Sequence, residues 1–140
     1  MTSSSTDFLT TGRRVIRREA RALEALAEAL GDSFGAAVGL LMQAKGRVIV
    51  SGMGKSGHIA RKIAATFAST GTPAHFVHPA EASHGDLGMV AEGDVLLILS
   101  NSGETPELAD ILAHAKRFGI PLIGVAGRAG STLMRQADVG

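Results

Sequence analysis

The sequence contains no cysteine, no tryptophan and no tyrosine, and each absence narrows what the protein can do. Without cysteine there is no disulfide, no thiolate metal site and no cysteine nucleophile, and nothing opposes a location in the reducing cytoplasm. Aromatic residues make up 4% of the chain and all are phenylalanine. This scarcity disfavours the aromatic platforms on which nucleic-acid bases or sugar rings stack.

An excess of charge of one sign is also lacking, because 14 Lys and Arg face 13 Asp and Glu and leave a formal net charge of +1. Such a balance gives no global attraction to nucleic acid or to an anionic membrane. No apolar run approaches the roughly 20 residues of a membrane span, and the polar start MTSSSTDFLTTGRR lacks the apolar region of a signal peptide. We therefore expect a cytoplasmic protein with no nucleic-acid partner and no membrane partner.

What is present suits one globular domain. The 140 residues are 45% apolar, and no repeat, low-complexity tract or linker divides them. Glycine accounts for 18 residues, well above the usual share of about 7%. Glycine permits tight turns and a close approach of the backbone to a ligand. We expect a single domain over residues 1–140.

Hydrophobic periodicity predicts two helices within residues 1–45 and an α/β core over residues 46–140. Residues 1–9 are expected to be frayed, and the two helices to run over residues 12–30 and 34–42. Short apolar runs predict buried strands at residues 47–50, 73–77, 95–99 and 122–125, with helices at 55–70, 106–118 and 131–137. Residues 138–140 have the pattern of a fifth strand, at which we expect the core to be truncated.

Strands that alternate with helices indicate βαβ units, and hence a parallel sheet with right-handed crossovers. The predicted fold class is α/β, a three-layer αβα sandwich around a parallel sheet of about five strands. Ligands of such folds bind beyond the carboxyl ends of the strands. The loops expected to carry function are therefore residues 51–57, 78–88, 100–105 and 126–131.

The first of these loops, GMGKSG at residues 52–57, fits the dinucleotide pattern G-x-G-x-x-G. A dinucleotide site also needs an acidic residue after the second strand, which this chain lacks, and Ile49 replaces the first glycine of a P-loop. An anion site remains, made by backbone N–H groups near Gly54 and Ser56 at a helix start and by the charge of Lys55. A solvated loop lysine is the alternative.

The loop after the third strand, SNSGET at residues 100–105, crowds small polar groups into one turn. Hydroxyls and helix N-terminal amides together can hold a phosphate, although an ordinary capping cluster is the alternative. The candidate phosphate ligands are Ser100, Asn101, Ser102, Gly103 and Thr105. Glu104 is the candidate general base, and a helix-capping glutamate is its alternative role.

Histidines gather in the loop after the second strand, where His78 and His84 accompany Glu81 and Asp86. These types bind divalent metals, but their spacing matches no tight ligand signature, so we expect no required metal. A histidine in such a loop more often holds a substrate hydroxyl.

Five arginines at residues 13, 14, 17, 18 and 21 crowd two turns of the first helix. A nucleic-acid contact is conceivable. Because Glu24 and Glu28 balance part of this charge, a solvated or subunit-facing helix is favoured.

The segments GMGKSGHIARKIAATFASTGTPAHFVHPAEASHGDLGMV, LSNSGET and PLIGVAGR together resemble the sugar-isomerase (SIS) domain of arabinose-5-phosphate isomerases. The resemblance runs from about Gly46 to Gly140. It implies a flavodoxin-like sheet, a homotetramer, and interconversion of D-ribulose 5-phosphate and D-arabinose 5-phosphate through a cis-enediol, toward the Kdo sugar of lipopolysaccharide. No cofactor is required for that chemistry.

The same resemblance implies roles for single residues. Lys55 and Glu104 match positions implicated in catalysis, and His84, Gly71 and Thr72 match contacts to the sugar phosphate. His78 matches a position that binds zinc, which is inhibitory in that family and not a cofactor.

Full-length members of that family continue beyond this point, with further catalytic groups and a pair of CBS domains. Two alternatives therefore stay open: a regulatory module that binds a phosphosugar, and an incomplete SIS domain that binds without catalysis.

Overall fold

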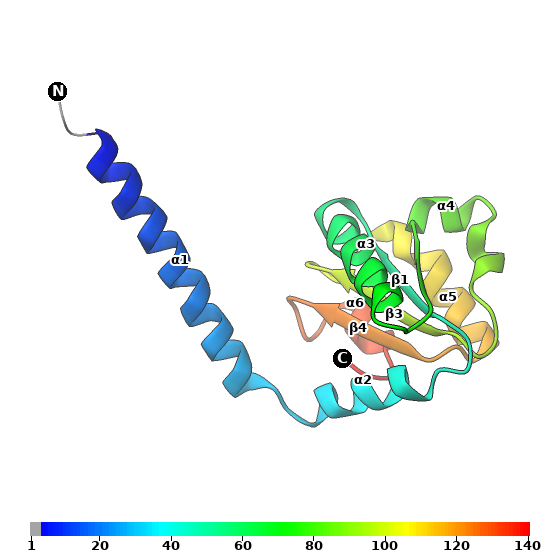
Figure 1. Ribbon diagram of the computed structural model, residues 1–140. Helices are drawn as coiled ribbons and strands as arrows, with labels where there is room; N and C mark the ends of the chain where they lie inside the picture. The colour runs from blue at the N-terminus through cyan, green and yellow to red at the C-terminus, as the bar shows by residue number, and fades with distance from the viewer. Residues whose placement is uncertain (1–3) are drawn as a thin grey trace. The chain divides into compact units, whose positions relative to one another are not determined.

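A computed structural model describes residues 4–140 in two units, one up to Asp32 and the other from Ser33 to Gly140 (Figure 1). The first unit is the helix α1, Ser4–Ala29. It begins at Ser4 and not at Gly12, so the expectation of a frayed start is wrong for residues 4–9, and residues 1–3 lie outside the described part. Asp7 in the first turn favours this early start, because a carboxylate stabilises a helix N-terminus.

The second unit contains the predicted α/β pattern. Its strands are β1 (Val48–Gly52), β2 (Ala74–Val77), β3 (Val95–Ser100) and β4 (Leu122–Ala126). Its α-helices are α2 (Asp32–Gln43), α3 (Gly54–Ser69), α4 (Pro79–Ser83), α5 (Ala109–Phe118) and α6 (Thr132–Gln136), and its 3-10 turns are η1 (Asp86–Met89) and η2 (Pro106–Leu108). No single helix within residues 4–140 is both long and apolar enough to cross a membrane.

All four predicted strands are present with small shifts at their ends. The predicted helix over residues 106–118 is divided, since η2 forms its first turn and α5 the remainder. Neither α4 nor η1 was predicted, because both are too short to show a helical period. The expected fifth strand is represented by one isolated parallel bridge between Ile123 and Val139.

The sheet is parallel, with strand order β2-β1-β3-β4. Val48 of β1 lies between Ala74 of β2 and Val95 of β3, and Leu96 of β3 pairs with Leu122 of β4. All four carboxyl ends therefore lie at one edge of the sheet. β1 has the second strand of the chain on one side and the third on the other, so the winding of the chain reverses between β1 and β3.

Two apolar layers enclose the sheet, because side chains alternate between its faces. Ile49 and Leu96 belong to the core beneath α4, α5 and α6, whereas Val48 and Leu97 belong to the core beneath α2 and α3. Figure 1 shows α3 and α5 on opposite faces. The predicted three-layer αβα sandwich is confirmed.

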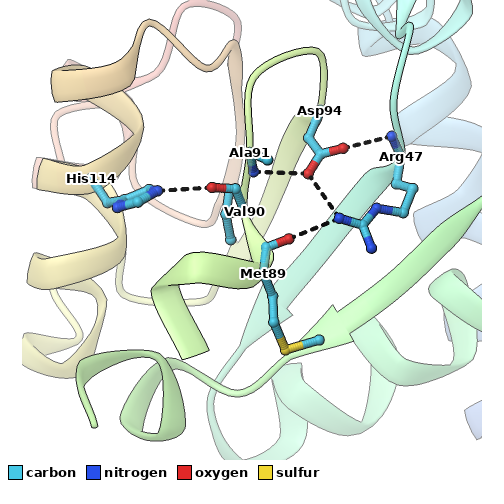
Figure 2. A network of polar contacts seen from close by, with 6 residues as sticks. All are labelled: Arg47, Met89, Val90, Ala91, Asp94 and His114. Atoms are coloured by element: carbon cyan, nitrogen blue, oxygen red, sulfur yellow. Dashed lines mark hydrogen bonds and ion pairs between the residues drawn. The ribbon is translucent and has the colours of Figure 1, made fainter. Parts of the chain in front are cut away.

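Asp94 joins the amino ends of β1 and β3 through the network in Figure 2. Its carboxylate is 3% exposed and accepts hydrogen bonds from the backbone N–H groups of Arg47 at 2.7 Å and Ala91 at 3.0 Å. The Arg47 guanidinium lies 3.6 Å from the same carboxylate and donates to the carbonyl of Met89 at 3.2 Å. This network fixes the edge of the sheet opposite to the carboxyl ends of the strands.

Candidate functional site

A hollow of about 340 Å³ lies where the loops after β1 and β3 meet. Its position is the point between β1 and β3 at which the winding of the chain reverses, and this is where open α/β sheets bind their ligands. The lining residues are Met53, Lys55, Ser56, Leu99, Ser100, Asn101, Ser102 and Thr105. Six of these eight were predicted as site residues, and the structure brings them together from two loops.

Two of the three glycines of the first loop, Gly52 and Gly57, bring α3 close against the strands. A Cβ added to Gly52 would lie 2.9 Å from the Leu99 carbonyl oxygen, and one added to Gly57 would lie 2.6 Å from the Gly52 carbonyl oxygen. Gly54 has φ +56°, in the left-handed region that glycine adopts most readily. The glycine pattern therefore has a structural cause that does not depend on a dinucleotide.

The N-terminus of α3 opens into this hollow without a capping side chain. Met53 holds the capping position and makes no side-chain hydrogen bond to the helix. The first N–H groups of a helix lack partners within it and carry partial positive charge. Lys55, which is exposed, adds a full positive charge at the same place. The combination suits an anion.

The loop after β3 is held by its own hydroxyls. Ser100 is 5% exposed, and its Oγ lies 2.9 Å from Thr105 Oγ1 and accepts a hydrogen bond from the Gly103 N–H at 3.1 Å. The Glu104 N–H donates to Ser102 Oγ at 3.2 Å. Within residues 4–140, no oxygen accepts the N–H of Ser102 or Thr105, so two donors of this loop are free for a ligand.

The carboxylate of Glu104 binds the start of α6. Its two oxygens accept hydrogen bonds from the backbone N–H and the hydroxyl of Thr132, at 2.8 and 2.6 Å. These two bonds hold the pKa of Glu104 below its ordinary value, with smaller contributions from Arg135 and Arg128. Glu104 lines a second hollow, of about 330 Å³, together with Thr132. Lys55 and Glu104, the two residues predicted to act together, thus line different hollows.

The predicted histidines lie on either side of α4, which follows β2. His78 immediately precedes α4, its Nδ1 is buried without a hydrogen-bond partner among the described residues, and its ring contacts that of Phe76 edge-on. His84 is exposed at the end of α4. The part of the chain that the structure describes contains no group of three His, Asp or Glu side chains that could hold a metal ion. His78 has no companions there for a zinc site.

Gly71 and Thr72 lie at the opposite edge of the sheet. They follow α3 and precede β2, next to the amino end of β1, where Val48 N–H donates to the Pro73 carbonyl. The five residues of β1 separate that edge from the hollow by about 16 Å. The resemblance placed these two residues with the other substrate contacts, but one copy of the chain does not bring them together.

The residues that fasten the loop after β3 were not predicted as site residues, although the loop at residues 126–131 was expected to carry function. These are Ser131 and Thr132 at the start of α6, and Gly127, whose N–H donates to the Asn101 carbonyl at 3.1 Å. A Ser-Thr pair before a short apolar stretch is a helix-start signal. The helix predicted at residues 131–137 corresponds to α6, but a local signal could not predict its contact with a loop so distant in the sequence.

The sequence model of the SIS domain family matches residues 40–140. The chain belongs to the SIS domain family. This SIS domain is 53% identical over 137 residues to arabinose 5-phosphate isomerase KdsD of Pseudomonas aeruginosa, across 98% of this chain and 42% of the relative. It is 50% identical over 133 residues to KdsD of Escherichia coli K12, across 95% and 40%.

Solved structures give the same result. The SIS domain superimposes with a TM-score of 0.91 on a protein of Escherichia coli CFT073 in complex with arabinose 5-phosphate, at 43% identity over 97% of this chain and 72% of that one. The resemblance stated from the motifs is therefore confirmed. The chain spans about two fifths of the length of the curated relatives it matches.

Proposed function

We propose that this protein interconverts D-arabinose 5-phosphate and D-ribulose 5-phosphate through a cis-enediol. The observation that carries the proposal is the hollow between β1 and β3, where Lys55, the uncapped start of α3 and the loop at residues 100–105 converge. Such a set of donors suits the phosphate of a sugar phosphate. The relatives named arabinose 5-phosphate isomerase, and the similar structure in complex with that sugar phosphate, support this choice of sugar.

In this proposal the phosphate lies against the amides of α3 and the hydroxyls of Ser56, Ser102 and Thr105. Lys55 stabilises negative charge on the phosphate or on the enediolate. Holding the phosphate tightly contributes to catalysis, because binding energy remote from C1 and C2 positions the reacting carbons. His84 orients a sugar hydroxyl.

Isomerisation also needs a base near C1 and C2. Glu104 was predicted for that role, and it stays a prediction that requires the carboxylate to leave Thr132. The proposal requires no metal and no cofactor. It places the protein in the cytoplasm, and its product would supply a pathway to the Kdo sugar of lipopolysaccharide.

One alternative function has an observation in its favour. Glu104 is held by Thr132 and lines a different hollow from Lys55. In this alternative, the SIS domain binds a sugar phosphate and does not move a proton. The two functions share the phosphate site and differ only in catalysis.

Proton exchange separates them. The protein is incubated in deuterated water with D-arabinose 5-phosphate, and NMR follows deuterium at C2 and the appearance of ribulose 5-phosphate. We expect both in the wild type, and a loss of about tenfold or more in Lys55→Met, because one charged contact to the phosphate or enediolate is removed. Lys62→Met, on an exposed turn of α3, is the matched control. Binding without exchange supports the alternative, and an undiminished Lys55→Met rejects this assignment of the site.

We propose further that the protein is a homo-oligomer paired through α1. Four large apolar side chains recur at seven-residue spacing along this helix and just past its end, and they are 49–67% exposed: Leu9, Ile16, Leu23 and Leu30. A repeat of this kind is typical of helices that pack along a seam. Exposed apolar side chains in such a row mark a contact surface.

The charges of the helix favour a second copy as the partner. The arginines at residues 13, 14, 17, 18 and 21 outnumber Asp7 and Glu19 in its first part, whereas its last part carries Glu24 and Glu28 and no basic residue. Two copies running antiparallel would place each basic part against an acidic part. This pairing accounts for a dimer, and the tetramer stays a prediction. Sedimentation of Leu23→Asp should give monomers, while Thr11→Asp, on the other side of the helix, should not. Monomeric wild type would contradict the proposal.

A further inference from the structure

The contact between Glu104 and the start of α6 indicates a role for Glu104 that differs from the predicted general base. We propose that Glu104 is a positioning residue, which ties the loop at residues 100–105 to α6 and so holds the phosphate-binding groups in place. The inference rests on the proposed function for its ligand, a sugar phosphate, and on the structure alone for the tie itself.

Three hydrogen bonds make the tie. The Thr132 N–H donates to Glu104 Oε1 at 2.8 Å, and the Thr132 hydroxyl donates to Oε2 at 2.6 Å. The Leu133 N–H donates to the Gly103 carbonyl at 3.0 Å. Both carboxylate oxygens are therefore occupied, and two successive residues of the loop are bound to two successive residues of α6.

Close packing supports the same contact. Gly103 has φ +65°, and a Cβ added there would collide with the side chain of Ser131, which is 2% exposed. Leu133 is fully buried in the core beneath α5 and α6. Because Leu133 fixes α6 to the core, a loop bound to α6 is fixed to the core as well.

Charge keeps the carboxylate in its accepting form. Arg135 Nη2 donates to Thr132 Oγ1 at 2.8 Å, and this hydroxyl donates in turn to Glu104. These contacts stabilise the ionised carboxylate, whose lowered pKa makes it a weaker base. The same geometry that improves a tie therefore works against proton abstraction.

Ser102 connects Glu104 to the hollow between β1 and β3. The Glu104 N–H donates to Ser102 Oγ at 3.2 Å, and Ser102 and Thr105 on either side of Glu104 line the hollow and have free N–H groups. If Glu104 lost its hold on α6, the turn that aims these two donors would lose its anchor on that side. The consequence is weaker binding of the phosphate.

The experiment compares Glu104→Ala, Glu104→Gln and Thr132→Val with Thr132→Ser, which keeps the hydroxyl, and with the double variant Glu104→Ala/Thr132→Val. Thr66→Val is the matched control, since its exposed hydroxyl bonds only within α3. Two quantities are measured: amide hydrogen exchange of Thr132 and Leu133 in the ligand-free protein, and the Kd and, where turnover occurs, the kcat and KM for arabinose 5-phosphate.

We expect faster exchange of both amides in Glu104→Ala. We expect Kd and KM to rise about tenfold in Glu104→Ala and severalfold in Thr132→Val, since charged hydrogen bonds contribute at that level. Glu104→Gln should lie closer to wild type because an amide oxygen still accepts, and Thr132→Ser should restore binding. The double variant should be no worse than Glu104→Ala, because both changes break one contact.

Two results would overturn the inference. One is unchanged amide exchange of Thr132 and Leu133 in Glu104→Ala. This measurement needs no ligand, so it tests the positioning role even if the protein has no isomerase activity. The other is a loss of kcat of about 10²-fold or more in Glu104→Gln at unchanged KM, with Thr132→Val like wild type, which is the pattern of a general base. A third result separates the two proposals. If the wild type binds no arabinose 5-phosphate but Glu104→Ala still speeds amide exchange, the proposed function is rejected and the positioning role of Glu104 is supported.

Discussion

Gly57 tests whether close packing of α3 on the strands builds the candidate site. Its added Cβ in Gly57→Ala would lie 2.6 Å from the Gly52 carbonyl oxygen and 3.3 Å from the Gly52 carbonyl carbon. Both are backbone atoms, which cannot turn aside as the end of a flexible side chain can. The start of α3 must therefore move away from β1 by several tenths of an ångström.

The magnitude follows from two opposing effects. Overpacking a tight contact costs about 1–3 kcal/mol, whereas alanine is favoured over glycine within a helix by about 1 kcal/mol. We expect Gly57→Ala to lower the free energy of unfolding by up to about 2 kcal/mol, and the melting temperature by up to about 10 °C for a domain of this size. Binding of arabinose 5-phosphate should weaken as well, because the amides of α3 move with the helix.

Urea unfolding followed by circular dichroism measures the change. Gly39→Ala in α2 is the matched control, since its Cβ would meet only Gln43 Nε2, at 3.9 Å. It should stabilise the protein by up to about 1 kcal/mol. Gly57→Ala at or above wild-type stability, with unchanged ligand affinity, would refute the packing argument.

Three further predictions concern other contacts. Asp94→Ala leaves the N–H groups of Arg47 and Ala91 without their acceptor, so the free energy of unfolding should fall by about 2 kcal/mol or more, against little change in exposed Glu92→Ala. Gly103 and Gly119 both have a φ near +65°, but an added Cβ would collide with Ser131 only at Gly103. Urea unfolding should show that Gly119→Ala lowers the free energy of unfolding by about 1 kcal/mol and that Gly103→Ala lowers it distinctly more. Equal losses would contradict the collision with Ser131. Folding lowers the pKa of Glu104, so its hydrogen bonds to Thr132 stabilise the protein at pH values above the ordinary glutamate pKa and are lost as the pH falls through the pKa of the folded state. The chemical shift of the Thr132 amide should therefore titrate with a midpoint below the ordinary glutamate pKa. A midpoint at or above that ordinary pKa would contradict the prediction.

Local sequence patterns predicted most of the fold for physical reasons. The buried run at residues 95–99 lies at the centre of a parallel sheet covered on both faces, and strands of this kind are apolar along nearly their whole length. The glycines at residues 52–57 and the hydroxyls at residues 100–105 signalled two loops, and the parallel topology placed both at one edge. Their meeting in one hollow follows from those two facts.

Contacts between distant segments could not be predicted in this way. Glu104 as general base is a reasonable hypothesis from its position, yet its partner Thr132 is set by how α6 packs on the core. Gly71 and Thr72 were assigned by resemblance alone, although the predicted helix and strand on either side of them already place them before a strand, at the edge opposite to the two loops. The early start of α1 was missed because its first turn is polar.

Mapping the ligand site by amide chemical shifts tests the central claim most directly. The labelled protein is titrated with arabinose 5-phosphate and, separately, with unphosphorylated arabinose. We predict that the phosphorylated sugar alone shifts the amides of Lys55, Ser56, Ser102 and Thr105 in one saturable process. Equal shifts with both sugars, or shifts confined to residues outside the hollow between β1 and β3, would contradict this assignment of the site.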